Sequence, residues 1–83
     1  MSEKIQLTEL RKGQMAVITD LAFFDDMRRR LQDLGFVKGA CVRCVGISPL
    51  GDPAAYEIGG GVIALRREDS SHILVEREEG SWD

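Results

Sequence analysis

The chain has 83 residues and a formal net charge of -3 at pH 7. This length allows a single small domain, and the acidic balance argues against a nucleic-acid binder, which usually carries an excess of basic residues. No stretch reaches the roughly 18 apolar residues of a transmembrane helix. Residues 1–6 lack the basic start and the apolar core of a signal peptide, so we expect a cytoplasmic protein.

A short helical turn and a strand begin the predicted domain. In residues 7–13, Leu7 and Leu10 would face inward from a single turn that Thr8 caps and Gly13 ends. The β-branched and apolar residues of segment 15–20 then predict the first strand.

Residues 25–34 predict the one longer helix of the chain. Its apolar residues repeat at i, i+4 and i+7 and share one face: Met27, Leu31 and Leu34. Gly35 is expected to end the helix, because glycine adopts the left-handed conformation without strain. The two phenylalanines at 23–24 are expected to pack on the apolar face of the helix.

Three consecutive arginines, Arg28, Arg29 and Arg30, lie within this helix. They either contact phosphate or an acidic partner surface, or form a solvated face balanced by the neighbouring aspartates. Because consecutive residues of a helix are rotated by about 100°, the three side chains cannot form one compact patch, which favours the solvated face. Arg28 and Arg29 are retained as candidate partner contacts.

The rest of the chain predicts short strands joined by turns. After a loop that ends in Gly39, the expected strands cover residues 41–47, 54–58, 62–66 and 72–76. The three glycines at 59–61 indicate a hairpin turn, because no helix or G-K-[ST] motif follows them. A single helical turn is expected at 67–71. Segment 77–83 predicts an acidic, frayed tail whose Trp82 either folds back or meets another chain.

The turn between the second and third predicted strands is strongly specified by its sequence. Pro49 supplies the φ angle needed at the second position of a type I turn, and Gly51 tolerates the left-handed conformation that follows. Pro53 favours an extended Asp52, which begins the next strand. This geometry does not need Leu50, so the leucine either covers the open end of the domain or contacts a partner.

Cys41 and Cys44 form a C-x-x-C sequence, which raises the question of a metal or redox site. The surrounding residues predict a strand, in which side chains three positions apart point to opposite faces. A structural zinc site also needs four ligands, and His72 is the only histidine of the chain. We therefore interpret the cysteines as two unrelated small apolar residues. A metal site shared between chains is the alternative.

Five short strands with one inserted helix predict a mainly β fold, a small barrel. The chain is too short for two full sheets, and closing one sheet on itself removes exposed edges. The interior would be filled by side chains and would hold no ligand cavity of useful size. The expected interior residues are Val17, Val42, Tyr56, Ile63, Leu65, Ile73 and Val75.

Several short motifs, taken together, resemble the FeoA family, the small cytosolic companions of the bacterial ferrous-iron transporter FeoB. They are Leu31-x-x-Leu34-Gly35-Phe36-x-x-Gly39, Pro49-Leu50-Gly51-Asp52-Pro53, Ala64-Leu65-Arg66 and Ile73-x-Val75. The resemblance covers residues 7–76 and implies one FeoA-like domain over 1–83, an SH3-like barrel with an inserted α-helix. The cysteine pair and the triple glycine are no part of this signature.

The resemblance also implies a function. FeoA-like proteins act in Fe(II) uptake with FeoB, a membrane protein with a cytosolic GTPase domain. The implied role is a non-enzymatic adaptor or regulator of such a transporter, which would bring the chain to the inner face of the membrane. No resident cofactor is expected beyond weak binding of Fe(II) or another divalent metal, and a homo-oligomer is left open.

Residues 49–53 are the best candidates for the partner contact, with Arg28 and Arg29 as a charged rim that sets orientation. The alternative function is a small metal-binding chaperone or sensor that uses Cys41, Cys44 and His72. An SH3-like nucleic-acid binder is disfavoured by the acidic balance of the chain.

Overall fold

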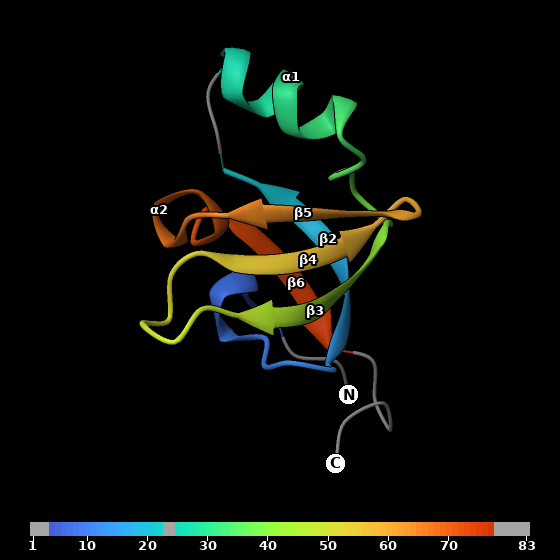
Figure 1. The fold of residues 1–83 in the computed structure, drawn as a ribbon. Helices are drawn as coiled ribbons and strands as arrows, with labels where there is room; N and C mark the ends of the chain where they lie inside the picture. Colours follow the sequence, from blue (N-terminus) through green and yellow to red (C-terminus); the bar gives the residue numbers. More distant parts are fainter. Residues whose placement is uncertain (1–3, 23–24, 78–83) are drawn as a thin grey trace.

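The computed structural model describes residues 4–22 and 25–77 and forms one antiparallel sheet (Figure 1). The strands are β1 (Lys4–Gln6), β2 (Met15–Leu21), β3 (Cys41–Ile47), β4 (Ala54–Ile58), β5 (Gly61–Leu65) and β6 (Ile73–Arg77). They are ordered β1-β6-β2-β3-β4-β5 across the sheet. The helices are the 3₁₀ turn η1 (Leu7–Glu9), α1 (Asp25–Asp33) and the short α2 (Arg67–Ser70). The packing predicted for residues 23–24 and for Trp82 lies outside the described residues.

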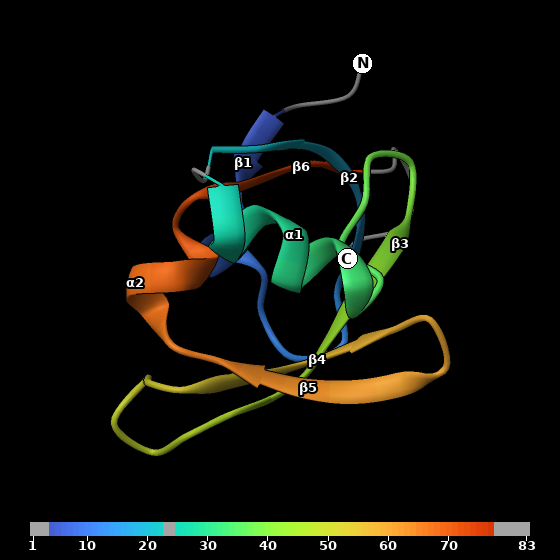
Figure 2. The same ribbon diagram turned by 90° about the horizontal axis from the view of Figure 1, so that it is seen from above.

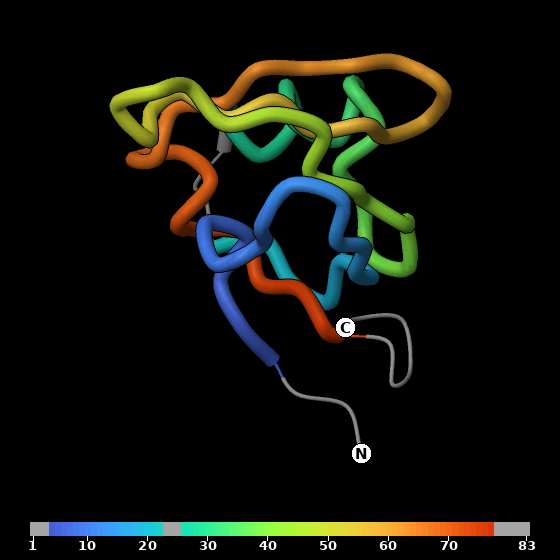
Figure 3. The backbone as a smooth tube through the Cα atoms, turned by 60° about the horizontal axis from the view of Figure 1, so that its bottom comes forward, coloured from blue at the N-terminus to red at the C-terminus, as the bar shows by residue number. Residues whose placement is uncertain are grey.

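The sheet curls around a single core, as expected for a small barrel. Seen from above, the strands surround an interior over which α1 lies (Figure 2). In the view turned so that the bottom of the molecule comes forward, the blue N-terminal turn lies in front and α1 lies behind (Figure 3). The two segments therefore close opposite ends of the barrel. The fully buried core side chains include Leu7, Ile18, Phe36, Val42, Tyr56, Ile73 and Val75. This confirms the mainly β fold class.

The structure has one strand more than predicted, because residues 4–6 pair with β6. Ile5 lies opposite Val75 and is buried with it, while Lys4 and Gln6 are exposed. A strand of three residues is too short for an alternation of apolar and polar residues to be recognised in the sequence. Only its pairing with β6 identifies it as a strand.

Val17 was wrongly expected in the interior. On β2 the buried residues are Ala16, Ile18 and Leu21, and Val17 is only partly buried. Directly opposed residues share a face of a sheet. Ala16 lies opposite the buried Val42, whereas Val17 lies opposite the exposed Cys41. The pairing with β3 therefore fixes which face of β2 points inward.

Leu34 shares the predicted apolar face of the helix and was expected to be buried with it, which is also wrong. The helix ends at Asp33, and Gly35 has a φ of 107°, as predicted for its stop. The Phe36 N–H then donates to the Leu31 carbonyl at 2.9 Å, which turns the chain back toward the core. Phe36 is fully buried, and Leu34 remains 46% exposed. Because Gly35 turns the chain in this way, Phe36 and not Leu34 packs into the core.

The N-terminal turn forms where it was expected, with a different cap. Leu7 and Leu10 are buried as predicted. The capping residue is Gln6 and not Thr8, because the Gln6 N–H donates to the Glu9 carboxylate at 2.8 Å. The turn ends at Glu9, before Gly13.

Candidate partner-binding site

The turn between β3 and β4 is held by its own hydrogen bonds. The Gly51 N–H donates to the Ser48 carbonyl at 2.7 Å, which places Pro49 at the second position, as predicted. Gly51 has a φ of 85°. The base is closed by the Ser48 N–H and Oγ, which donate to the carbonyls of Pro53 at 3.1 Å and Asp52 at 3.0 Å. The Asp52–Pro53 peptide bond is cis, which the sequence did not indicate.

Leu50 lies at the tip of this turn with 94% of its surface exposed. The interpretation that it covers the open end of the barrel is therefore wrong. A leucine held almost fully in water contributes almost nothing to the core, and its apolar area is available to another molecule.

Asp52 connects the turn to α2. Its Oδ1 accepts a hydrogen bond from the Arg67 N–H at 2.8 Å, across 15 positions of sequence. The residue that precedes the helix, Arg66, makes no side-chain cap of its own. A carboxylate at a helix N-terminus is favourable, because it accepts from N–H groups that lack a partner inside the helix. The turn and α2 are thus fixed to one another.

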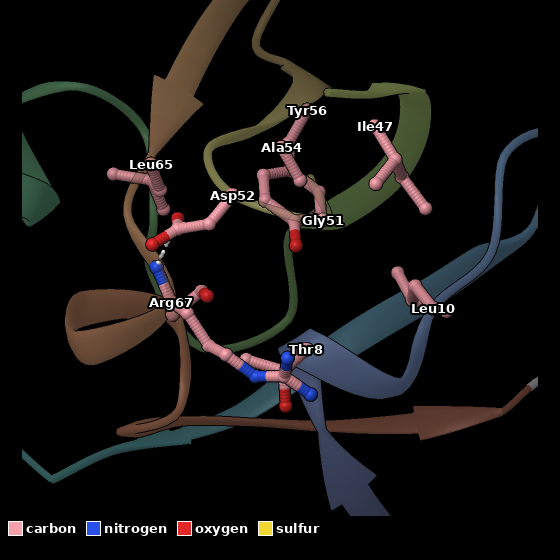
Figure 4. Close-up of a pocket in the computed structure, with 10 residues that line it drawn as sticks. Thr8, Leu10, Ile47, Gly51, Asp52, Ala54, Tyr56, Leu65 and Arg67 are labelled. Carbon is pink, nitrogen blue, oxygen red and sulfur yellow. Dashed lines mark hydrogen bonds between the residues drawn. The ribbon is translucent and has the colours of Figure 1, made fainter. Parts of the chain in front are cut away.

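A surface pocket of about 210 Å³ opens beside the turn. It is lined by Thr8, Leu10, Ile47, Gly51, Asp52, Ala54, Tyr56, Leu65, Arg67 and Ser70. Figure 4 shows the Tyr56 hydroxyl pointing between the lining residues, and the Arg67 side chain extending toward Thr8. We call residues 48–53 and this pocket the loop face.

Tyr56 forms the buried wall of the pocket. Burial raises the pKa of its phenol above the ordinary value, and a hydrogen bond with the Ser70 side chain partly opposes that effect. Ser70 is itself buried. The phenol is therefore neutral at physiological pH, and it lies in a hollow lined by both polar and apolar residues.

The candidate arginines lie elsewhere. Arg28 and Arg29 are exposed on α1, as predicted. Figures 1 and 2 place α1 at one end of the barrel and the β3–β4 turn at its side. The structure therefore does not bring these arginines next to Leu50. The basic residue that borders the loop face is Arg67.

The cysteines lie on opposite faces of β3. Cys41 is exposed, and Cys44 is buried with its S–H directed at the Gly46 carbonyl at 3.8 Å. Burial raises the pKa of the Cys44 thiol above its ordinary value. His72 is exposed before β6. Within residues 4–22 and 25–77, no three His, Cys, Asp or Glu side chains gather as a group that could hold a metal ion.

The sequence located the turn but not the pocket. The pocket residues come from η1, β3, β4, β5 and α2, which only the folded chain brings together. Arg67 and Ser70 appeared in the sequence only as parts of a polar helical turn. No local pattern indicates that they would adjoin Tyr56.

Comparison with known proteins gives consistent matches. The model of the FeoA domain matches residues 5–77. A Porphyromonas gingivalis protein, the "Fe(2+) transport protein A/Fe(2+) transporter FeoB fusion protein", is 39% identical over 72 residues. The match covers 87% of this chain and 8% of the fusion protein, so the chain spans a small part of that relative.

Two solved structures have a similar fold. The FeoA protein from Chlorobium tepidum has a TM-score of 0.83 at 34% identity, covering 95% of this chain and 79% of that one. The Stenotrophomonas maltophilia FeoA, complexed with zinc and described as a prokaryotic SH3 domain protein, has a TM-score of 0.73 at 36% identity, covering 93% of each chain. Separately, no helix in the described part of our chain is long and apolar enough to cross a membrane.

Proposed function

Because this chain belongs to the FeoA family, whose domain model matches residues 5–77, we propose that it regulates a FeoB-type ferrous-iron transporter by direct contact. In one relative the FeoA and FeoB parts belong to a single fusion protein, which supports a physical association. The Stenotrophomonas maltophilia protein is described as possibly a ferrous iron transport activating factor. The proposed location is the cytoplasm, at the inner face of the membrane.

The exposure of Leu50 is the observation that carries this proposal. A large apolar side chain that lies 94% exposed at the tip of a turn gives the isolated domain no core packing, and its area is free for contact. The hydrogen bonds of Ser48, Gly51 and Asp52 hold the tip in one conformation. A preformed turn loses little conformational entropy when it docks.

The pocket gives the loop face a second, concave feature. Leu50 would enter a hollow of the partner, and an apolar side chain of the partner would enter the space beside Tyr56. Arg67 and Asp52 at the border supply polar contacts that fix orientation. Buried apolar anchors with a polar border are the usual composition of an energetically important contact.

We propose an adaptor and not an enzyme. Tyr56 is the titratable group most deeply placed in the pocket, and its raised pKa keeps it protonated near neutral pH. A phenol in that state is suited to donating a hydrogen bond and not to accepting a proton from a substrate.

The alternative of a metal-binding chaperone or sensor draws on one observation, the zinc complex of the Stenotrophomonas maltophilia relative. In the part of this chain that the structure describes, Cys41 and Cys44 point to opposite faces, and no three potential ligands come together. We therefore prefer the adaptor, with iron as the cargo of the transporter.

The proposal is tested with Leu50→Asp. Titration of the purified chain into the cytosolic part of its FeoB-type transporter gives the Kd. Full burial of a leucine is worth about 1.5–3 kcal/mol, which corresponds to roughly a 10- to 150-fold weaker Kd. The melting temperature should stay unchanged, because the folded chain leaves Leu50 in water. Fe(II) uptake should fall in cells that carry only this variant.

Val37→Asp is the matched control, because Val37 is also an exposed apolar residue but lies after α1, away from the loop face. It should bind the transporter like the wild type. If Leu50→Asp bound with wild-type affinity, or if Val37→Asp weakened binding equally, the loop face would not be the contact.

A further inference from the structure

The two edges of the sheet are built differently. Edge strand β1 has three residues and carries Lys4, a charge that discourages pairing with another strand. Edge strand β5 has five residues, Gly-Val-Ile-Ala-Leu, with no charge and no proline. An edge strand of five residues without a charge or a proline lacks two of the features by which proteins protect such edges.

The register shows which backbone groups of β5 point outward. Ile58 and Gly61 flank the two-residue turn, and such a pair exchanges both of its hydrogen bonds. Hydrogen-bonded pairs alternate along an antiparallel ladder, so Ile63 and Leu65 also bond to β4. The N–H and C=O groups of Val62 and Ala64 therefore point away from β4, toward the open edge.

The same two residues carry the exposed side chains of β5. Val62 is 62% exposed and Ala64 is exposed, whereas Leu65 is buried. Figure 1 shows β5 as the outermost strand beside β4, with α1 beyond it on the side away from β4, and Figure 2 shows that α1 lies over the barrel interior and not along β5. The outer side of β5 therefore presents an apolar side chain together with four backbone groups that have no strand partner within residues 4–22 and 25–77.

We propose that β5 pairs with β5 of a second copy of this chain, antiparallel and about a two-fold axis at Ile63. Val62 of each copy then lies opposite Ala64 of the other, and four backbone hydrogen bonds form. The exposed valine covers the small alanine of its partner. Val62 and Ala64 lie on either side of Ile63, so a two-fold rotation about Ile63 exchanges their positions. The strand is therefore complementary to an identical copy of itself, as a closed two-fold interface requires.

Neighbouring residues exclude a shifted register. A shift toward the C-terminus would need the Arg66 carbonyl, which already accepts from the Asp69 and Ser70 N–H groups at 2.9 Å each. A shift toward the N-terminus would need an extended Gly60, which has a φ of 84°. Only Val62 and Ala64 are left to pair.

The charges beside β5 also fit this arrangement. Arg66 follows Ala64 on the same face of the strand and is exposed. Glu57 lies opposite Val62 on β4, where it is exposed and also pairs with the Arg43 Nε at 3.9 Å. In the two-fold register each Arg66 extends past Val62 of the second copy toward its Glu57. Two such opposite-charge contacts favour the second copy over an arbitrary extended peptide.

The test is the oligomeric state of the full chain as its concentration rises from micromolar to millimolar. One strand pair buries less than the roughly 1,200–2,000 Å² of a stable interface, so the dimer should appear only at the upper concentrations. Sedimentation equilibrium should then show the average mass rising toward twice that of the monomer. A wild-type chain that stays monomeric up to millimolar concentration would overturn the proposal.

Val62→Lys places a charge on the pairing edge and should keep the chain monomeric. Leu50→Lys places the same charge on the loop face and should dimerise like the wild type. Equal melting temperatures of dilute samples show that both variants fold. Dimerisation of Val62→Lys at wild-type concentrations, or its loss in Leu50→Lys, would contradict the β5 interface.

Amide hydrogen exchange locates the contact independently of any variant. The Val62 and Ala64 N–H groups should exchange fast in dilute samples and slowly in concentrated ones, while the Ile63 N–H, bonded to β4, is slow in both. If the Val62 and Ala64 amides exchanged at the same rate at both concentrations, a dimer would have to use another surface.

Discussion

Replacing Asp52 by alanine tests whether the turn and α2 form one unit. The Asp52 Oδ1 accepts the Arg67 N–H at 2.8 Å, and no side chain of Arg66 provides a substitute. Loss of such a cap costs typically about 1 kcal/mol, within a range of roughly 0.5–2 kcal/mol. The site is exposed, so water partly satisfies the freed N–H and no desolvation cost is added.

The expected loss of 1 kcal/mol lowers the melting temperature by about 4–8 °C in a domain of this size. Circular dichroism measures this shift, and hydrogen exchange of the Arg67 amide shows whether α2 is the part that loosens. Asp52→Asn keeps a side-chain oxygen at the same place and should lose less stability than Asp52→Ala.

Asp33→Ala is the matched control, because Asp33 is an exposed aspartate at the C-terminal end of α1, where a negative charge is unfavourable. Its stability should be unchanged or slightly higher. If Asp52→Ala melted at the wild-type temperature with no faster exchange at Arg67, Asp52 would not hold α2. Its carboxylate would then be free for the partner alone.

Two further predictions concern the core and its ionisable groups. Phe36→Ala should cost about 3–5 kcal/mol of unfolding free energy in urea, whereas Leu34→Ala should cost much less because Leu34 is half exposed; equal losses would contradict the helix end described above. The pKa values of Tyr56 and Cys44 are raised by folding, so the native state holds their protons longer than the unfolded chain. Stability should therefore be complete below about pH 9 and fall as pH rises further. The measurement is the melting temperature of the wild type and of Tyr56→Phe at neutral and at alkaline pH. The drop in melting temperature between the two should be smaller for Tyr56→Phe, and an equal drop would refute the role of Tyr56.

Local chemistry determined much of the fold in advance. Gly35, the 59–61 hairpin and the Pro49–Gly51 turn were predictable, because each depends on conformations that glycine and proline favour. The errors arose where a partner strand or a turn selects between two apolar residues. Nothing within β2 itself distinguishes Val17 from Ile18, and nothing near Leu34 shows that Phe36 will take the buried position.

The candidate site was predictable only in its protruding half. Leu50 stands out because the geometry of its turn does not require a leucine, and this can be seen from residues 48–53 alone. The pocket depends on five separate elements meeting, and the bond between Asp52 and Arg67 spans the whole β4–β5 hairpin. Such arrangements have no signature in a single sequence.

Tyr56 is the only tyrosine of the chain, and it lines the pocket of the loop face. A sample labelled with isotope at tyrosine rings alone would give one set of aromatic signals per molecule, with no assignment to resolve. Any transporter fragment or small molecule that enters the pocket would shift those signals directly. The domain therefore contains its own spectroscopic reporter, suited to screening for compounds that bind the loop face.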